Sequence, residues 1–284
     1  MQLVSFVRRG RSGFGLLREG RVLDLTSRFG PTVLSLRQLL AANLLGEVAA
    51  IARSEAPDIP LDTLMLLPVI PDPDKIICVG MNYREHAAEV GREVTAKPAL
   101  FARFQASQVG HCQPLIKPSV SDQFDYEGEL AVIIGKPGRH IPAVDALSHI
   151  AGYACYNEGS VRDWQRHTSQ FLAGKSFSRT GGFGPCLTTA DEVGDPTRLT
   201  LTTRLNGEVV QQASVGELIT SIPDLIAYCS TMIELIPGDV VVTGTPSGVG
   251  LKRNPPLFMK PGDVAEVEIP GVGLLVNPVQ AETI

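Results

Sequence analysis

The chain has 284 residues, of which 44% are hydrophobic and 19% are charged, and its net charge at pH 7 is −5. This composition is typical of a globular protein with one large domain, or with one large and one small domain. The chain has no basic block and no apolar run near the ~18 residues of a membrane span, so neither nucleic acid nor a membrane is an expected partner.

Two further features indicate a cytoplasmic protein. The 5 cysteines are odd in number and widely spaced, and none forms a Cys-x-x-Cys pair. This pattern favours free thiols in a reducing compartment over a disulfide framework or a zinc ribbon. In residues 1–9 the charges follow the apolar stretch, which is the reverse of the order in a signal peptide.

The first 70 residues predict a small module of mixed α+β structure. Alternating hydrophobic residues indicate strands over 2–8, 13–17 and 21–25. Leucines at helical spacing indicate a helix over 31–54, with Pro31 in its first turn. The run Pro-Asp-Pro-Asp at 71–74 then breaks the chain. We therefore expect a small N-terminal module over 1–70 and a main domain over 71–284, in a β-rich α+β protein.

A compact apolar strand over 75–80 leads into a segment, 81–89, that is predicted to be helical. His86 and Glu89 lie three residues apart there, so on a helix they share one face and contact each other. A carboxylate beside an imidazole fixes its tautomer, and such a pair can act as a general base. A chance ion pair on a surface helix is the alternative interpretation.

Residues 125–134 predict a strand that alternates at first and then becomes continuously apolar. Side chains alternate faces along a strand, so Asp125, Glu127 and Glu129 are expected to point the same way. Three carboxylates that enter a buried segment repel one another unless protons, Lys or Arg side chains, or a cation cancel their charge. Mg²⁺, Mn²⁺ and Ca²⁺ take oxygen ligands, so a metal site is one interpretation and a solvated edge strand is the other.

The second half of the chain alternates predicted strands with glycine-rich loops. Asn206-Gly207 predicts a hairpin of strands 199–205 and 208–212. The polar segment 157–165 predicts a helix start with Ser160 as N-cap. The loop 243–250 lacks the lysine of a P-loop, but its amides and hydroxyls suit a carboxylate ligand. Further predicted elements are helices at 143–150 and 216–236, the latter interrupted at Pro223, and strands at 152–156, 240–242, 264–269 and 272–276.

Five motifs, in this order along the chain, resemble the fumarylacetoacetate hydrolase family over roughly residues 75–278. Each motif alone is weak, but five in register are specific. Residues 1–70 resemble the more variable N-terminal extension of this family. The motifs are Val79-Gly80-Met81-Asn82-Tyr83 with His86 and Glu89, Tyr126-Glu127-Gly128-Glu129-Leu130-Ala131, Arg162-Asp163-Trp164-Gln165, Gly174-Lys175-Ser176 and Thr243-Gly244-Thr245-Pro246-Ser247-Gly248.

The resemblance implies a β-roll or barrel-like core, with residues 71–284 as the catalytic domain, that binds Mg²⁺ or Mn²⁺. Glu127 and Glu129 match two metal carboxylates of the family. The third is an Asp after an Asn, and its place here holds Glu158, whose extra methylene moves the oxygens outward. The other matches are His86 and Glu89 as the base pair, Lys175 at developing charge, Gln165, Thr245 and Arg103 at the substrate, and Asp125 and Arg162 in structural roles.

The resemblance also implies a 2-keto or 2,4-diketo acid substrate and hydrolytic cleavage of a C–C bond, in which pyruvate leaves as an enolate stabilised by the metal. Glu89 would orient His86, which deprotonates a water, while Lys175 and Gln165 stabilise the oxyanion. An oxaloacetate-type decarboxylase and a 2-hydroxy-dienoate isomerase use the same platform and stay open as alternatives. A metal-stabilised domain that binds a ligand without turnover is the non-enzymatic alternative. The family further implies a homodimer.

Overall fold

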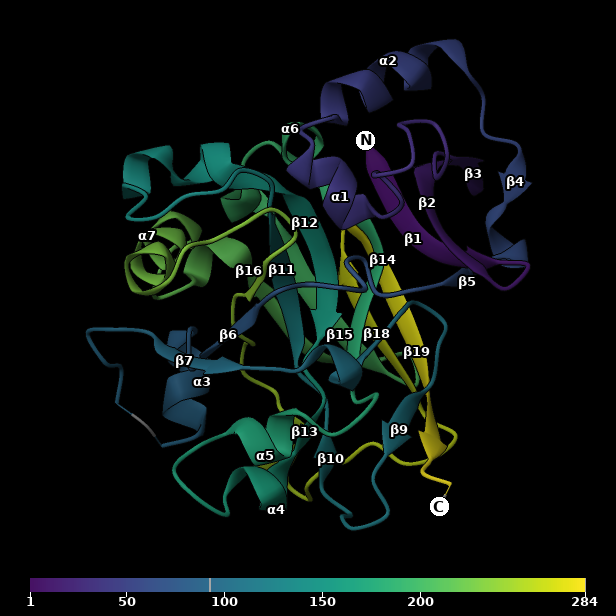
Figure 1. The fold of residues 1–284 in the computed structure, drawn as a ribbon. Helices are drawn as coiled ribbons and strands as arrows, with labels where there is room; N and C mark the ends of the chain where they lie inside the picture. The colour runs from purple at the N-terminus through teal and green to yellow at the C-terminus, as the bar shows by residue number, and fades with distance from the viewer. Residues whose placement is uncertain (92, 284) are drawn as a thin grey trace.

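The computed structural model describes residues 1–91 and 93–283, and a 12-stranded mixed sheet forms its centre (Figure 1). Two adjacent inner strands, β12 (Ile150–Asn157) and β11 (Gly128–Ile134), are buried at every residue, which explains why their apolar runs do not alternate. The main path of the sheet is β4 (Ile59–Pro60), β3 (Arg21–Asp24), β2 (Arg11–Arg18), β1 (Gln2–Arg8), β14 (Gly181–Thr189), β12 (Ile150–Asn157), β11 (Gly128–Ile134), β17 (Val240–Val242), β6 (Ile76–Gly80) and β7 (Ala99–Ala102). β5 (Met65–Leu66) pairs with β1, and β8 (Gln108–Val109) pairs with β14.

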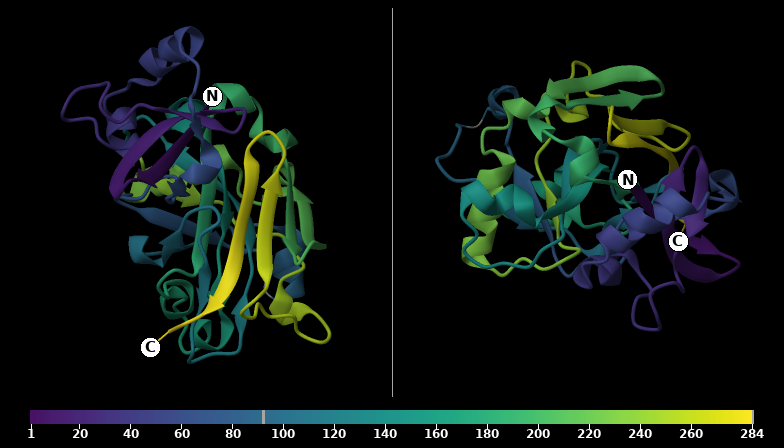
Figure 2. Two further views of the ribbon diagram at one scale, coloured as in Figure 1. Left: turned by 90° about the vertical axis from the view of Figure 1, so that its right-hand side faces the viewer. Right: turned by 90° about the horizontal axis from the view of Figure 1, so that it is seen from above.

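A second, five-stranded sheet packs against the central one, and its yellow strands β18 and β19 run along one side of the molecule in Figure 2. Leu130 and Val132 of β11 share a buried cluster with Leu201 and Val267 of the second sheet. The predicted hairpin is confirmed, with positive φ angles of 54° at Asn206 and 82° at Gly207. The strand order of this sheet is β16 (Glu208–Ser214), β15 (Thr200–Leu205), β18 (Val264–Ile269), β19 (Gly273–Ala281) and β9 (Leu115–Lys117).

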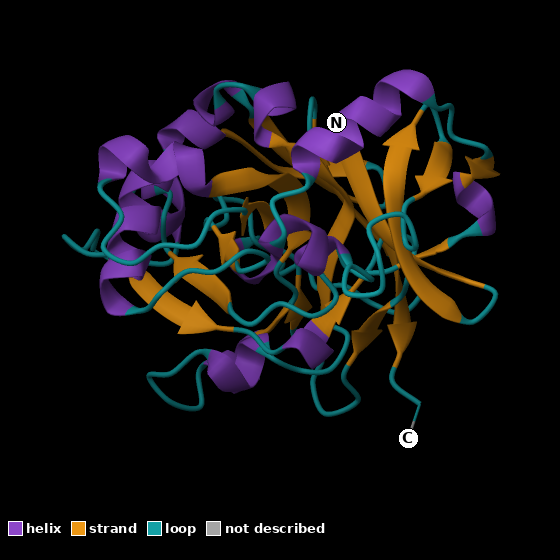
Figure 3. Ribbon diagram, turned by 45° about the horizontal axis from the view of Figure 1, so that its top comes forward, coloured by secondary structure: helices purple, strands orange, loops and turns teal. Residues whose placement is uncertain are grey.

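The expected β-rich α+β class is confirmed, and the core is an open arrangement of sheets. In residues 1–91 and 93–283 neither large sheet closes on itself, so the core is not a closed barrel. Figure 3 shows the helices around the outside of the strands. Every helix among the described residues is too short or too polar for a membrane span.

The N-terminal segment continues the central sheet, because Gln2 and Leu3 of β1 pair with β14. The single helix predicted over 31–54 is wrong, since the segment holds α1 (Leu36–Ala41) and α2 (Leu45–Ser54). Ser35 caps α1 by accepting a hydrogen bond from the Gln38 amide, and Asn43, with φ of 56°, separates the two helices. The division into parts 1–70 and 71–284 stays a prediction.

Two predicted helix signals act differently in the structure. Pro223 is the second residue of α7 (Ile222–Met232), in the first turn after the N-cap Ser221, so it does not interrupt a longer helix. Ser160 is not an N-cap: it lies in β13 (Ser160–Val161), which pairs with β10 (Phe124–Asp125), and its hydroxyl donates to the Glu158 carbonyl. The remaining helices are α3 (Arg84–Glu89), α4 (Arg162–Gln165), α5 (Leu172–Lys175) and α6 (Ala190–Val193), with 3₁₀ turns at Leu61–Thr63, Gln105–Ser107, Ala143–His149, Pro196–Arg198, Val215–Glu217 and Gly250–Lys252.

Candidate active site

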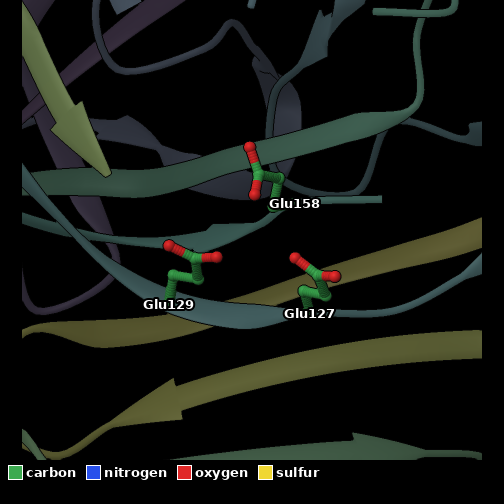
Figure 4. A group of neighbouring side chains, drawn as sticks. All are labelled: Glu127, Glu129 and Glu158. Atoms are coloured by element: carbon green, nitrogen blue, oxygen red, sulfur yellow. The ribbon is translucent and has the colours of Figure 1, made fainter. Parts of the chain in front are cut away.

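Three buried glutamates meet where β11 begins and β12 ends. Gly128 of β11 pairs with Asn157 of β12, and this register brings Glu158 beside Glu127 and Glu129. Figure 4 shows the carboxylates of Glu127 and Glu129 side by side, with that of Glu158 facing them. One oxygen from each lies within 4.8 Å of the others. The three residues are only 4%, 1% and 1% exposed, in sequence order, so the longer side chain of Glu158 still reaches a shared, water-poor space.

Asp125 lies outside this acidic triad, which consists of Glu127, Glu129 and Glu158. Asp125 and Glu127 bind the same Arg162 guanidinium, but the predicted continuous strand is interrupted after Asp125, where β10 pairs with β13. Asp125 accepts hydrogen bonds from Arg162 at 2.8 Å and from the backbone amide of Gly250, also at 2.8 Å. Its role is therefore to hold Arg162 and a loop in place, as a structural residue does.

Two cations, Arg162 and Lys175, compensate the charge of Glu127. Glu127 lies 2.6 Å from Arg162 and 2.7 Å from Lys175, whose ammonium also donates to Glu158 at 2.9 Å. Burial would raise the pKa of Glu127, but the charges of Lys175 and Arg162 outweigh it and lower that pKa overall. Burial likewise disfavours the Lys175 ammonium, yet Glu127 and Glu158 keep its pKa above the ordinary value. Glu127 and Lys175 are therefore both charged.

Glu129 and one oxygen of Glu158 are less well compensated. Burial raises the pKa of Glu129 well above its ordinary value, and the charges of Glu158 and Glu127 raise it further. Its one hydrogen-bond donor in the described part of the chain is the Gly244 amide. The Glu158 Oε1 atom is buried and has no hydrogen-bond partner among the described residues. The Arg103 guanidinium lies 4.0 Å from this oxygen, beyond hydrogen-bond distance, and a buried carboxylate oxygen without a donor is costly.

The donor set fits a hard divalent cation. Among residues 1–91 and 93–283, Glu127 and Glu158 have cationic partners but Glu129 forms no ion pair, so the triad keeps a carboxylate that Mg²⁺ or Mn²⁺ would stabilise. All the candidate ligand atoms are oxygens, the type that these ions prefer. Glu127, Glu129 and Glu158 are the residues that would hold it.

The predicted base pair forms and opens onto the same cavity as the triad. His86 Nδ1 lies 3.0 Å from Glu89 Oε2 on α3, and the other Glu89 oxygen accepts from the Gly248 amide at 2.9 Å. His86 is 6% exposed, so the pair is not an ion pair on an open surface. Because Nδ1 faces Glu89, Nε2 is the ring atom left to exchange a proton with a bound molecule.

Two of the three predicted substrate-binding residues line the cavity, and the third does not. Gln165 lines the cavity, and its Oε1 accepts from Arg162 at 3.0 Å, which leaves its side-chain NH₂ as the donor. Thr245 also lines the cavity, but its hydroxyl donates to the Gly128 carbonyl at 3.0 Å. Arg103 is not among the lining residues: its guanidinium donates to the Gly159 carbonyl and lies 4.0 Å from Glu158, behind the triad.

The loop 243–250 binds carboxylates, though those of the protein rather than the predicted substrate group. The amides of Gly244, Gly248 and Gly250 donate to Glu129, Glu89 and Asp125, respectively. The loop therefore joins the triad, the base pair and the anchor of Arg162.

The cavity has a volume of about 470 Å³ and includes residues that the sequence analysis did not single out. Arg166 and Lys252, both exposed, lie at its rim. Arg166 directly follows the motif Arg162–Gln165, so its charge was a signal in the sequence. Lys252 lies two residues after the loop 243–250, and only the folded structure shows that it lines the cavity. The other lining residues of this kind are Val90, Phe101, Thr168, Ser169, Phe171 and Leu251.

The electrostatics of the triad predict that Glu129→Gln stabilises the metal-free protein. Glutamine keeps an oxygen acceptor for Gly244 but removes a buried charge. A raised folded-state pKa means that wild type loses stability as pH rises above the unfolded value of about 4.5. The gain of the variant should therefore be small at pH 5 and about 1–3 kcal/mol at pH 8. Thermal and urea unfolding in EDTA at both pH values measures it.

Glu208→Gln, which alters an exposed carboxylate at the start of β16, is the matched control and should change stability little. Mn²⁺ should raise the unfolding temperature of wild type and of Glu208→Gln far more than that of Glu129→Gln. A Glu129→Gln protein that unfolds below wild type in EDTA at both pH values would contradict this account of the triad.

Comparisons with known proteins agree on one family. Residues 75–280 match the family described as Fumarylacetoacetate (FAA) hydrolase C-terminal. The chain is 42% identical to oxaloacetate tautomerase FAHD2A, mitochondrial, from Homo sapiens over 228 residues, which is 80% of this chain and 73% of that protein.

Two solved structures share the whole fold. Fumarylacetoacetate hydrolase from Exiguobacterium antarcticum is 34% identical, with a TM-score of 0.82 over 99% of this chain and 100% of that one. Maleylpyruvate hydrolase from Sphingobium sp. SYK-6, in complex with manganese(II) ion and pyruvate, is 28% identical, with a TM-score of 0.83 over 100% of both chains. These relatives are enzymes, a tautomerase and two hydrolases. The chain therefore belongs to the fumarylacetoacetate hydrolase family.

Proposed function

We propose that this protein is a divalent-metal-dependent enzyme that interconverts the keto and enol forms of oxaloacetate or a closely related 2-oxo acid. The observation that carries the proposal is that the His86–Glu89 pair and the triad of Glu127, Glu129 and Glu158 line or flank one cavity. The human relative named as an oxaloacetate tautomerase supports this choice of reaction at 42% identity. The proposed cofactor is Mg²⁺ or Mn²⁺.

Tautomerisation moves one proton, and the chain supplies one positioned base. Bound at the triad, a divalent ion would act as a Lewis acid toward the 2-oxo group. His86 Nε2 would take a proton from the carbon beside that group and return it to the oxygen, while the electron pair of the broken C–H bond forms the C=C bond. Glu89 holds the imidazole in the required tautomer through Nδ1. The Gln165 side-chain NH₂ is placed to donate to the substrate.

Hydrolytic C–C cleavage of a 2,4-diketo acid, such as an acylpyruvate, is the second candidate. The manganese- and pyruvate-containing structure of maleylpyruvate hydrolase favours it. Hydrolysis needs, besides the base, a water and a donor at the oxyanion on the distal carbonyl. Lys175, one of two residues predicted for that donor role, is already bound to Glu127 and Glu158. Because Lys175 is held by these two glutamates, tautomerisation, which needs only proton transfer, is the favoured reaction.

The remaining expectations stay predictions. Oxaloacetate decarboxylation, dienoate isomerisation and ligand binding without turnover would use the same site. A homodimer and a cytoplasmic location also stay predictions, and the name of the human relative is that of a mitochondrial protein.

His86→Ala should slow oxaloacetate tautomerisation on the order of 10²–10⁴-fold, the usual contribution of a positioned general base. Glu89→Gln should cost less, about tenfold, because the imidazole remains but loses its charged partner. Metal-promoted decarboxylation of oxaloacetate should fall much less in both variants. The rates are measured by the ultraviolet absorbance of the enol, with the spontaneous rate subtracted, on one preparation of each variant.

Glu85→Gln is the matched control, because Glu85 lies on the same helix but faces Ser247. We expect its rates within about twofold of wild type, as for most surface changes. A folded His86→Ala protein that tautomerises oxaloacetate at the wild-type rate would show that the pair is not the base.

Metal removal should abolish tautomerisation, because the divalent ion that would act as the Lewis acid toward the 2-oxo group is then lost. The measurement compares wild type in excess EDTA with the same sample after added Mg²⁺ or Mn²⁺, using oxaloacetate and an acylpyruvate in parallel. Tautomerisation should exceed acylpyruvate cleavage in kcat/KM. Full activity in EDTA refutes the metal dependence, and faster acylpyruvate cleavage identifies the hydrolase instead.

A further inference from the structure

The rim of the cavity carries two cations that the proposed mechanism does not use. Arg166 follows α4, and Lys252 ends the 3₁₀ turn Gly250–Lys252, so both reach the cavity from different parts of the chain. From these positions we infer that Arg166 and Lys252 bind the second carboxylate of a 2-oxo dicarboxylate. This inference rests on the proposed function for the orientation of the substrate.

Arg166 is fixed in place with part of its guanidinium unused. Its Nε donates to the Arg162 carbonyl at 3.1 Å, and one terminal nitrogen donates to Gln123 at 2.9 Å. The other terminal nitrogen makes no hydrogen bond within residues 1–91 and 93–283. An arginine that is held on one side presents its remaining N–H groups in a defined direction, which favours binding of a carboxylate.

Lys252 also sits on a fixed support. Asp125 accepts hydrogen bonds from the amides of Gly250 and Leu251, at 2.8 and 2.9 Å, and so anchors the turn that carries Lys252. In the described ranges no carboxylate forms an ion pair with Lys252 or with Arg166. By contrast, Arg162 and Lys175 in the same cavity are both paired with glutamates.

The two ends of the cavity therefore carry opposite charges. Its inner end holds the buried acidic triad, where a cation and the 2-oxo acid end of a substrate belong. Its rim holds two exposed cations in a chain whose net charge is −5. A substrate with a carboxylate at its far end can form charge-assisted hydrogen bonds there, whereas a monocarboxylate of the same length cannot. Arg166 and Lys252 thus act as specificity-determining residues, and not as catalytic ones.

The test uses two inert 2-hydroxy acids that differ by a single carboxylate, L-malate and L-lactate. Both are titrated calorimetrically into the Mn²⁺-loaded protein. Wild type should bind malate more tightly than lactate. Arg166→Gln and Lys252→Gln should each weaken malate binding about threefold, and the double variant about tenfold, as exposed charge pairs allow. Lactate affinity should change less than about twofold.

Lys260→Gln, which removes an exposed lysine that is not among the cavity's lining residues, is the control and should leave the preference for malate unchanged. An equal loss of affinity for malate and for lactate in the double variant would overturn the inference. The two cations would then attract any anion and would not bind the second carboxylate specifically. A wild-type protein without preference for malate would also overturn it.

Oxaloacetate turnover by wild type is measured beside these titrations, which separates the two proposals. A malate preference that depends on Arg166 and Lys252, in a protein that does not tautomerise oxaloacetate, supports the dicarboxylate site and refutes the proposed reaction. Turnover of oxaloacetate with no effect of either substitution on malate binding supports the reaction and refutes the site.

Discussion

Like charges confined in a water-poor space are the constraint on which the rest of this site depends. The antiparallel pairing of β11 and β12 forces the carboxylates of Glu127, Glu129 and Glu158 together, and burial denies them water. Lys175 and Arg162 pair with Glu127, and Lys175 also binds Glu158. Among the described residues, however, Glu129 accepts a hydrogen bond only from the Gly244 amide, and one Glu158 oxygen has no hydrogen-bond donor. The protein therefore stores an electrostatic cost that a divalent cation would remove, which is the physical basis for a metal centre here.

The loop 243–250 links this centre to the proposed base. Its backbone amides hold Glu129 of the triad, Glu89 of the base pair and Asp125, which in turn fixes Arg162. A shift of the loop would thus disturb the metal ligands, the imidazole orientation and the turn beneath Lys252 together. This shared support explains how side chains that are distant in sequence keep one geometry, as a catalytic site requires.

Local sequence patterns predicted the parts of the fold that local physics decides. The Asn206-Gly207 hairpin and the apolar strand after Glu129 formed as expected, because turn chemistry and burial are both visible in the sequence. The carboxylates of Glu127 and Glu129 were also found from strand alternation. The break in the strand after Asp125 was not predicted, because β10 pairs with β13, a partner later in the chain that no local pattern reveals.

Side-chain directions set by tertiary contacts were beyond sequence reasoning. The resemblance assigned Arg103 to the substrate, yet its donors are taken by the Gly159 carbonyl and by Thr180, outside the cavity. The Thr245 hydroxyl likewise binds the Gly128 carbonyl. Lys252 was missed for the converse reason, since only the folded chain brings it to the rim beside Arg166.

The most direct test of the central claim is anomalous diffraction from crystals grown with Mn²⁺. The account predicts one manganese peak per chain, about 2.0–2.3 Å from carboxylate oxygens of Glu127, Glu129 and Glu158. It also predicts a bond from the ion to the Glu158 oxygen that has no partner here. A structure at saturating Mn²⁺ with no peak between the three carboxylates, and with Lys175 alone bridging Glu127 and Glu158, would contradict it.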